Sequence, residues 1–324
     1  MPTSTTSIEE QYAALRERAG LVDRDDRGHI DVTGPDAAEF LQGQVTNDVE
    51  ALEPGTGCYA AMLTPKARIV ADMRIFRRSP DELWIDTPAD ALEVVLRDLR
   101  MYKIGRQVEI ADRTGERSVV SLIGPAAREF AGEALGGNVL LPDLAEHSFT
   151  ETGAAGRTLL VAATNTGIDL LGGRETVDET ARVLASAGAE PVSAQAAEVL
   201  RIETGRARLG ADMSEETLPG EAGIVDRAVS FTKGCYVGQE PVARMYHRGH
   251  PNRHLRGLRL ATPAEPGTPL MAGDKDVGRV TSVATSPRLG PIALGMVRRE
   301  VEPGDEVRMG PDGPAATVVE LPFA

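Results

Sequence analysis

One short stretch of the chain holds the residue types best suited to chemistry. Residues 233–240 read Lys-Gly-Cys-Tyr-Val-Gly-Gln-Glu, which places Cys235 between Gly234 and Gly238. Glycine lets backbone amides approach a ligand closely, so this spacing predicts an accessible turn that presents the thiol. The lysine would favour the nucleophilic thiolate, whereas Glu240 would oppose it if it came equally near. The same residues also fit a loop punctuated by glycines, with a small and inert cysteine.

A basic window follows this stretch in an otherwise acidic chain. It contains five arginines and three histidines, namely Arg244, Arg248, Arg253, Arg256, Arg259, His247, His250 and His254. Its position beside the cysteine favours an anion-binding rim, although a solvated basic loop produces the same pattern. The histidine spacing would suit a metal on one helix face. Gly249 and Pro251 interrupt such a helix, so we expect no metal site.

A carboxylate stands inside an expected strand over residues 67–76. Asp72 is the odd residue in a run that is otherwise largely apolar. Aspartate is uncommon in strands and costly to bury without a partner. Two interpretations remain open at this point. Asp72 is either a functional carboxylate or an outward-facing residue on the face that it shares with Arg74 and Phe76.

The expected elements alternate between strands and helices in two successive blocks. Helices are expected over residues 7–20, 37–45, 87–101, 124–135, 175–187 and 193–204, and strands over 29–33, 57–63, 67–76, 82–86, 107–111, 118–123, 149–151, 157–163 and 167–171. This order suggests paired ferredoxin-like α+β units. Short strands at 255–260, 278–285, 292–297 and 306–309, separated by glycine and proline turns, predict a small β-barrel. We therefore expect two domains, residues 1–249 and 250–324.

Composition argues against several classes of protein. The 324 residues carry a net charge of −14, which disfavours broad nucleic-acid binding through phosphate neutralisation. No apolar run approaches the ~20 residues of a membrane span. The first ten residues lack the basic and apolar regions of a signal peptide. Cys58 and Cys235 are the only cysteines, so no disulfide framework is expected. These features predict a cytoplasmic protein without a membrane or direct nucleic-acid partner.

The octapeptide at 233–240 resembles the signature of the YgfZ family of folate-binding proteins. That signature usually reads Lys-Gly-Cys-Tyr/Phe-Thr/Ile-Gly-Gln-Glu, and this chain differs from it only at Val237. The family is related to the T-protein (aminomethyltransferase) of the glycine cleavage system. Residues 34–48, 201–212 and 278–287 are similar to segments of T-proteins. The resemblance implies an α+β fold of two intertwined ferredoxin-like units around a folate-binding central hole, followed by a small C-terminal β-barrel.

The resemblance also implies roles for individual residues. T-proteins grip the pterin ring of folate with a glutamate, for which Glu203 is the first candidate and Glu221 the second. A carboxylate suits this role because its two oxygens can accept from a ring N–H and an exocyclic amine in one plane. T-proteins carry two aspartates where this chain reads Ala71-Asp72, and one is thought to hold the reactive part of tetrahydrofolate. The expected folate-binding set is completed by Lys233, Gln239, Glu240 and Arg244.

The leading interpretation is a tetrahydrofolate-binding accessory protein with a functional thiol at Cys235. The resemblance implies that it supports the assembly or repair of iron–sulfur enzymes, including cluster-dependent tRNA-modifying enzymes. Its partners would be folate and either iron–sulfur enzymes or cluster-assembly proteins. A lone cysteine cannot hold a cluster, so a cluster role would need further ligands from a partner. The alternative is a folate-dependent aminomethyl- or methyltransferase that uses Asp72.

Overall fold

The computed structural model of the chain describes residues 6–135, 145–153 and 157–324. Its contacts divide the chain into two compact units. The first comprises Met1–Met62, Val70–Ala197 and Ala228–Val237, and the second comprises Leu63–Ile69, Glu198–Arg227 and Gly238–Ala324. The backbone passes between the units several times. Each unit is therefore assembled from segments that are distant in sequence.

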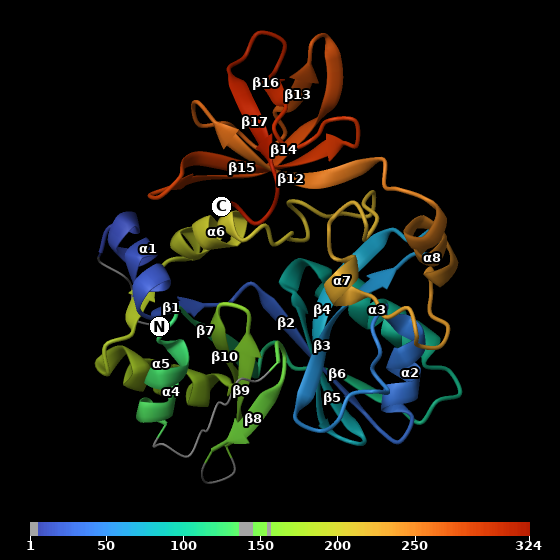
Figure 1. The fold of residues 1–324 in the computed structure, drawn as a ribbon. Helices are drawn as coiled ribbons and strands as arrows, with labels where there is room; N and C mark the ends of the chain where they lie inside the picture. Colours follow the sequence, from blue (N-terminus) through green and yellow to red (C-terminus); the bar gives the residue numbers. More distant parts are fainter. Residues whose placement is uncertain (1–5, 136–144, 154–156) are drawn as a thin grey trace. The chain divides into compact units, whose positions relative to one another are not determined.

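The first unit contains a five-stranded sheet with the strand order β3-β4-β5-β2-β6 (Figure 1). Its strands are β2 (Arg27–Thr33), β3 (Thr56–Leu63), β4 (Ile69–Ser79), β5 (Glu82–Pro88) and β6 (Glu109–Asp112), and its helices are α2 (Ala37–Gln44), the 3-10 turn η1 (Ala89–Ala91) and α3 (Leu92–Tyr102). In α3, Val95, Leu96 and Leu99 recur at helical spacing and are buried. This apolar face anchors the helix against β2 and β6.

A six-stranded sheet in the same unit has the strand order β11-β1-β7-β10-β9-β8. Its strands are β1 (Gly20–Asp23), β7 (Arg117–Ile123), β8 (Phe149–Thr152), β9 (Leu159–Thr164), β10 (Gly167–Gly173) and β11 (Glu190–Val192), and its helices are α1 (Ile8–Glu17), α4 (Ala127–Ala134) and α5 (Arg174–Ser186). Among the pairings of the described strands in this sheet, only β1 with β11 is parallel. The helices α4 and α5 bury Ala131, Val177 and Leu184 in one core with the sheet.

The two sheets of this unit share a second core. Phe76 and Trp84 from the five-stranded sheet pack with Phe149, Leu160 and Leu171 from the six-stranded sheet. The rings of Phe76 and Phe149 meet edge to face, with centroids 5.8 Å apart. Edge-to-face contact is a preferred arrangement of aromatic pairs. The interior between the sheets is therefore apolar, and charged groups can enter it only in pairs.

The second unit contains a closed β-barrel with the strand order β12-β15-β14-β13-β16-β17. Its strands are β12 (Arg253–Leu260), β13 (Pro269–Ala272), β14 (Lys275–Ser286), β15 (Gly290–Arg298), β16 (Glu306–Met309) and β17 (Ala315–Val319). Alternate residues such as Leu258, Val280 and Val318 fill its interior. Three helices precede the barrel strands in sequence, namely α6 (Ala194–Glu203), α7 (Val225–Ala228) and α8 (Gln239–Arg248). All of α8 belongs to this unit.

The predicted fold class, α+β with a small C-terminal β-barrel, is confirmed. Several element bounds differ from the expectation. The expected helix over 7–20 ends at Glu17, because Gly20–Asp23 forms β1 and pairs with β7 and β11. No helix was expected over Gln239–Arg248, but these residues form α8. Pro241 lies in the first turn of α8, where a missing N–H costs no intrahelical bond. Within the described residues, no helix is both long and apolar enough to span a membrane.

His29 on β2 predicts a pH dependence of folding. Burial lowers its pKa to about 4, while its ordinary value is 6.5. Between pH 6.5 and 4, His29 takes up a proton in the unfolded chain but stays neutral in the folded chain. The free energy of unfolding therefore falls as pH falls through this window. The loss should reach about 3 kcal/mol. Urea unfolding at pH 7.5, 5.5 and 4.5 should show this loss in the wild type and a smaller one in His29→Gln. Equal pH slopes for the two proteins would contradict the prediction.

Candidate functional site

Asp72 on β4 combines burial with an unused hydrogen-bonding atom. The residue is 9% exposed, and its Oδ2 accepts a hydrogen bond of 2.9 Å from the hydroxyl of Tyr59 on β3. Its Oδ1 is buried and has no hydrogen-bond partner among the described residues. A buried carboxylate oxygen without a partner is energetically costly. This oxygen is therefore available to an N–H or O–H donor of a ligand.

Three neighbouring groups act on the charge of Asp72. Burial raises its pKa above the ordinary value, and this effect exceeds the opposing effects of Arg27 and the Tyr59 hydroxyl. Asp86 raises the pKa further by repulsion. A carboxyl group with a raised pKa exchanges its proton more readily near neutral pH. Asp72 thus has the character of a general acid or base.

The charges close to Asp72 are largely satisfied by one another. Arg27 Nε donates to Asp86 Oδ1 at 2.8 Å, and Arg74 forms ion pairs with both Asp86 and Asp169. Burial alone would raise the pKa of Asp86, but Arg27 and Arg74 bring it below its usual range. Two arginines and two aspartates balance in this set. Asp72 consequently has no counter-charge of its own within it.

Lys233 has a different environment from the one its sequence neighbours suggested. Its Nζ donates to the backbone carbonyl oxygens of Gln42, Val45 and Asn47 at 2.6–2.8 Å. Burial lowers its pKa to about 8. The ammonium form still predominates at neutral pH, because three carbonyl acceptors require three N–H donors. Lys233 therefore satisfies orphan carbonyls at the C-terminal end of α2. Its expected role in folate binding remains a prediction.

The two cysteines differ in exposure, since Cys235 is exposed and Cys58 is only partly exposed. Cys235 is exposed, as the sequence predicts, and it precedes the buried residue Tyr236. Burial raises the pKa of the Cys58 thiol to about 12. Thiolate is the reactive form of cysteine, so Cys58 is chemically quiet at neutral pH. Cys235 is the accessible thiol of the chain.

The two candidate pterin-binding glutamates are buried in the second unit. Glu203 is 2% exposed and accepts a hydrogen bond of 2.5 Å from the hydroxyl of Ser286. Glu221 is 4% exposed and pairs with Arg253 at 3.2 Å and with Arg68 at 3.6 Å. Glu221 is thus held by two guanidinium groups. The guanidinium of Arg288 lies 3.8 Å from the Glu203 carboxylate.

The remaining expected folate ligands lie at the start of α8. Glu240 and Arg244 form an ion pair one helical turn apart, and both side chains are largely exposed. Gln239 is partly buried at the first position of the helix. Such an exposed pair contributes little to stability. Within the expected anion-binding rim, Arg253 is already paired with Glu221 and Arg256 with Glu320.

The predicted site residues therefore fall into two groups. Asp72, Lys233 and Cys235 belong to the first unit, and Glu203, Glu221 and the α8 residues belong to the second. The residues that sequence reasoning missed are those around Asp72, namely Tyr59, Arg27 and Asp86. Each comes from a different strand of the five-stranded sheet. Only knowledge of the strand order could have found them.

The arginine–aspartate set predicts opposite effects on Asp72 from two substitutions. Arg27→Gln removes the positive charge that most lowers the pKa of Asp72 and should raise that pKa, whereas Asp86→Asn leaves Arg27 unneutralised and should lower it. We expect shifts of about one pH unit in each direction. The measurement is a ¹³C NMR titration of the aspartate carboxyl carbons, with Asp72→Asn to assign the signal.

Asp169→Asn provides the matched control for this titration. It removes the same charge as Asp86→Asn, but Asp169 pairs with Arg74 and is not among the main groups that act on Asp72. Its effect on the pKa of Asp72 should be clearly smaller. Shifts of the same sign in Arg27→Gln and Asp86→Asn would show that the set does not tune Asp72.

Comparisons with known proteins agree with this architecture. The family model for the GCVT N-terminal domain matches residues 2–233, and the model for the Glycine cleavage T-protein C-terminal barrel domain matches residues 253–324. An aminomethyltransferase of Rubrobacter xylanophilus is 34% identical over all of this chain and 88% of its own length. One from Thermotoga petrophila is 30% identical over all of this chain and 91% of its own length.

A solved structure supports the same fold. The glycine cleavage system aminomethyltransferase T from Bartonella henselae superposes with a TM-score of 0.89 at 24% identity, covering all of this chain and 91% of that protein. At this identity the likeness concerns the fold. The family follows from the sequence models and relatives, which span nearly the whole chain. The chain therefore belongs to the glycine cleavage T-protein (aminomethyltransferase) family.

Proposed function

We propose that this protein binds a reduced folate, tetrahydrofolate or a one-carbon-substituted form, and transfers an aminomethyl or methyl unit with Asp72 as its acid–base group. The observation that carries the proposal is the buried Oδ1 of Asp72, which lacks a partner among the described residues. Membership of the aminomethyltransferase family supports the same chemistry. This reading favours the transferase over the accessory role that the octapeptide alone suggested.

The residues around Asp72 fit a folate amine. A reduced folate supplies a secondary amine that carries the one-carbon unit. Asp72 Oδ1 would accept an N–H from such a group, while the Tyr59 hydroxyl fixes the other carboxylate oxygen at 2.9 Å. The raised pKa of Asp72 lets the carboxyl hold a proton and release it to a leaving amine. Burial on β4 keeps bulk water away from this proton.

Glu203 is the better candidate for the pterin-binding carboxylate. It accepts a hydrogen bond from the Ser286 hydroxyl, and the guanidinium of Arg288 lies 3.8 Å away. Glu221 would have to give up close contacts with Arg253 and Arg68 in order to grip a pterin. Breaking hydrogen-bonded ion pairs with two guanidinium groups is costly for a buried carboxylate, which favours Glu203 over Glu221. The expected contribution of Gln239, Glu240 and Arg244 on α8 to folate binding stays a prediction.

A second candidate function is favoured by the exposure of Cys235. An accessible thiol within a YgfZ-like octapeptide fits a folate-binding accessory factor that maintains iron–sulfur enzymes. In that role Cys235 would contact a partner, and Asp72 would only bind folate. The two candidate functions differ in whether one-carbon transfer occurs at all. They also differ in which of the two side chains is indispensable.

Asp72→Asn tests the transferase proposal. The amide keeps the size of the side chain but can neither carry the charge nor exchange the proton. Tetrahydrofolate binding, measured by calorimetry, should weaken about tenfold. Tetrahydrofolate-dependent release of ammonia from an aminomethyl donor should slow by about 10²–10⁴-fold. Wild-type protein that binds tetrahydrofolate but releases no ammonia would overturn the transferase role and leave the accessory role.

Cys235→Ala separates the two candidate functions. Under the transferase proposal the variant should bind tetrahydrofolate and turn over like the wild type, because the thiol takes no part. Under the accessory role it should bind tetrahydrofolate normally and yet fail to restore iron–sulfur enzyme activity in cells that lack the protein. Cys58→Ala serves as the matched control, since that thiol is only partly exposed and its raised pKa keeps it protonated at neutral pH.

A further inference from the structure

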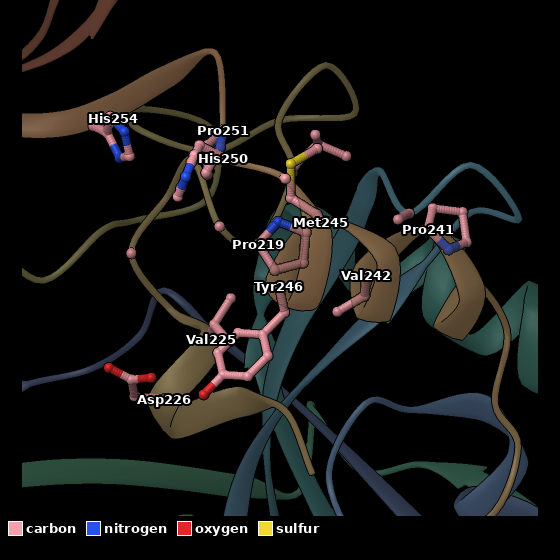
Figure 2. A pocket seen from close by; sticks show the side chains of 15 residues that line it. Pro219, Val225, Asp226, Pro241, Val242, Met245, Tyr246, His250, Pro251 and His254 are labelled. Carbon is pink, nitrogen blue, oxygen red and sulfur yellow. The ribbon is translucent and has the colours of Figure 1, made fainter. Parts of the chain in front are cut away.

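The second unit contains a pocket that the proposed function does not use. Its volume is about 320 Å³, and it lies between residues 218–226, helix α8 and the turn at 249–254 (Figure 2). None of its described lining residues is one of the candidate folate ligands Asp72, Glu203, Glu221, Lys233, Gln239, Glu240 and Arg244. The size falls within the range of small-molecule sites. Helix α8 lines the pocket with residues other than its candidate folate ligands.

Apolar side chains make up most of the pocket wall. Leu218, Val225, Val242 and Met245 line it, and Tyr246 adds an aromatic ring. Val242 is 5% exposed, so it forms a fixed part of the wall. Burying apolar ligand surface here contributes roughly 25 cal/mol per Å². The wall is suited to a ligand with an apolar body.

The charged group of the pocket is a carboxylate. Among the described residues that line it, Asp226 is the one acidic residue, and neither lysine nor arginine occurs. Figure 2 shows Asp226 and the ring of Tyr246 at one end, with His250 and His254 at the other. Burial and the charge of Arg256 lower the pKa of His254, so its imidazole is uncharged at neutral pH. The field inside the pocket is thus set by a negative charge.

One glycine positions helix α8, and another lines the pocket itself. Gly238 precedes α8 with φ +84°, and a Cβ there would lie 2.7 Å from the carbonyl oxygen of Thr64. This close approach holds the start of α8 against the turn between β3 and β4. A Cβ on Gly220, which lines the pocket, would lie 3.1 Å from Pro251 on the opposite segment. Side chains at either glycine would narrow or shift the pocket wall.

We propose that this pocket binds a small organic cation, an aromatic or branched apolar body that carries an ammonium group. The apolar wall would take the body, and the Asp226 carboxylate would pair with the ammonium group. The face of the Tyr246 ring attracts a cation through its quadrupole, and the Met245 thioether is a soft, polarisable neighbour. An anionic ligand would meet Asp226 without a lysine or arginine among the described lining residues to compensate it.

Three probes that share one ring test the preference for charge. Phenethylammonium, 2-phenylethanol and 3-phenylpropionate carry a positive, neutral and negative group on similar apolar bodies. Binding is measured at pH 7.5 by titration of [¹³C-methyl]methionine-labelled protein, followed at the Met245 methyl signal. We expect the cation to bind about fivefold more tightly than the alcohol. The carboxylate should bind more weakly than either.

Asp226→Asn is the decisive variant, because Asp226 is exposed and the substitution preserves its shape. The preference for the cation over the alcohol should disappear, while the affinity for the alcohol should stay the same. Glu215→Gln removes an equal charge from an exposed residue that does not line the pocket, and it should leave the preference intact. Tyr246→Leu should weaken the cation more than the alcohol. Equal binding of all three probes, or a preference unaffected by Asp226→Asn, would overturn the inference.

Discussion

The buried charges around Asp72 are balanced within one set of two arginines and two aspartates. Arg27 and Arg74 are matched by Asp86 and Asp169, and the apolar interior between two sheets tolerates them because each charge has a partner. Asp72 is the carboxylate left outside this balance. Burial then outweighs the opposing effects of Arg27 and the Tyr59 hydroxyl and raises its pKa. The raised pKa thus reflects burial beside arginines that are already paired.

Sequence reasoning identified Asp72 but could not explain it. A carboxylate in an apolar strand is visible as a departure from strand composition, and the fold class followed from the alternation of elements and from family resemblance. Tyr59 and Asp86, which act on Asp72, come from other strands, and their proximity depends on the strand order. Short pairings such as β1 with β11 were missed for the same reason. Such short strands contain too few residues for a clear sequence pattern, and whether they form depends on hydrogen bonds to residues that are distant in sequence.

The role of Lys233 shows where local reading of a motif is weakest. Its closeness to Cys235 in sequence suggested an electrostatic partner for the thiol. The structure directs its ammonium group to three carbonyls at the end of α2 instead. A side chain four methylenes long reaches groups that are far from its own backbone. The exposure of Cys235 needed only the flanking glycines, and that expectation was confirmed.

The same lysine limits how far the accessible thiol can travel. Cys235 lies two residues after Lys233, whose ammonium group is held by hydrogen bonds, and directly before the buried residue Tyr236. The chain is therefore fixed on both sides of the thiol. Two residues of chain span at most ~7 Å, and the burial of Tyr236 restricts the movement of Cys235 further. Cys235 therefore cannot carry a bound group from one site to another distant site. A partner that uses this thiol must bring its own reactive atom to the protein surface.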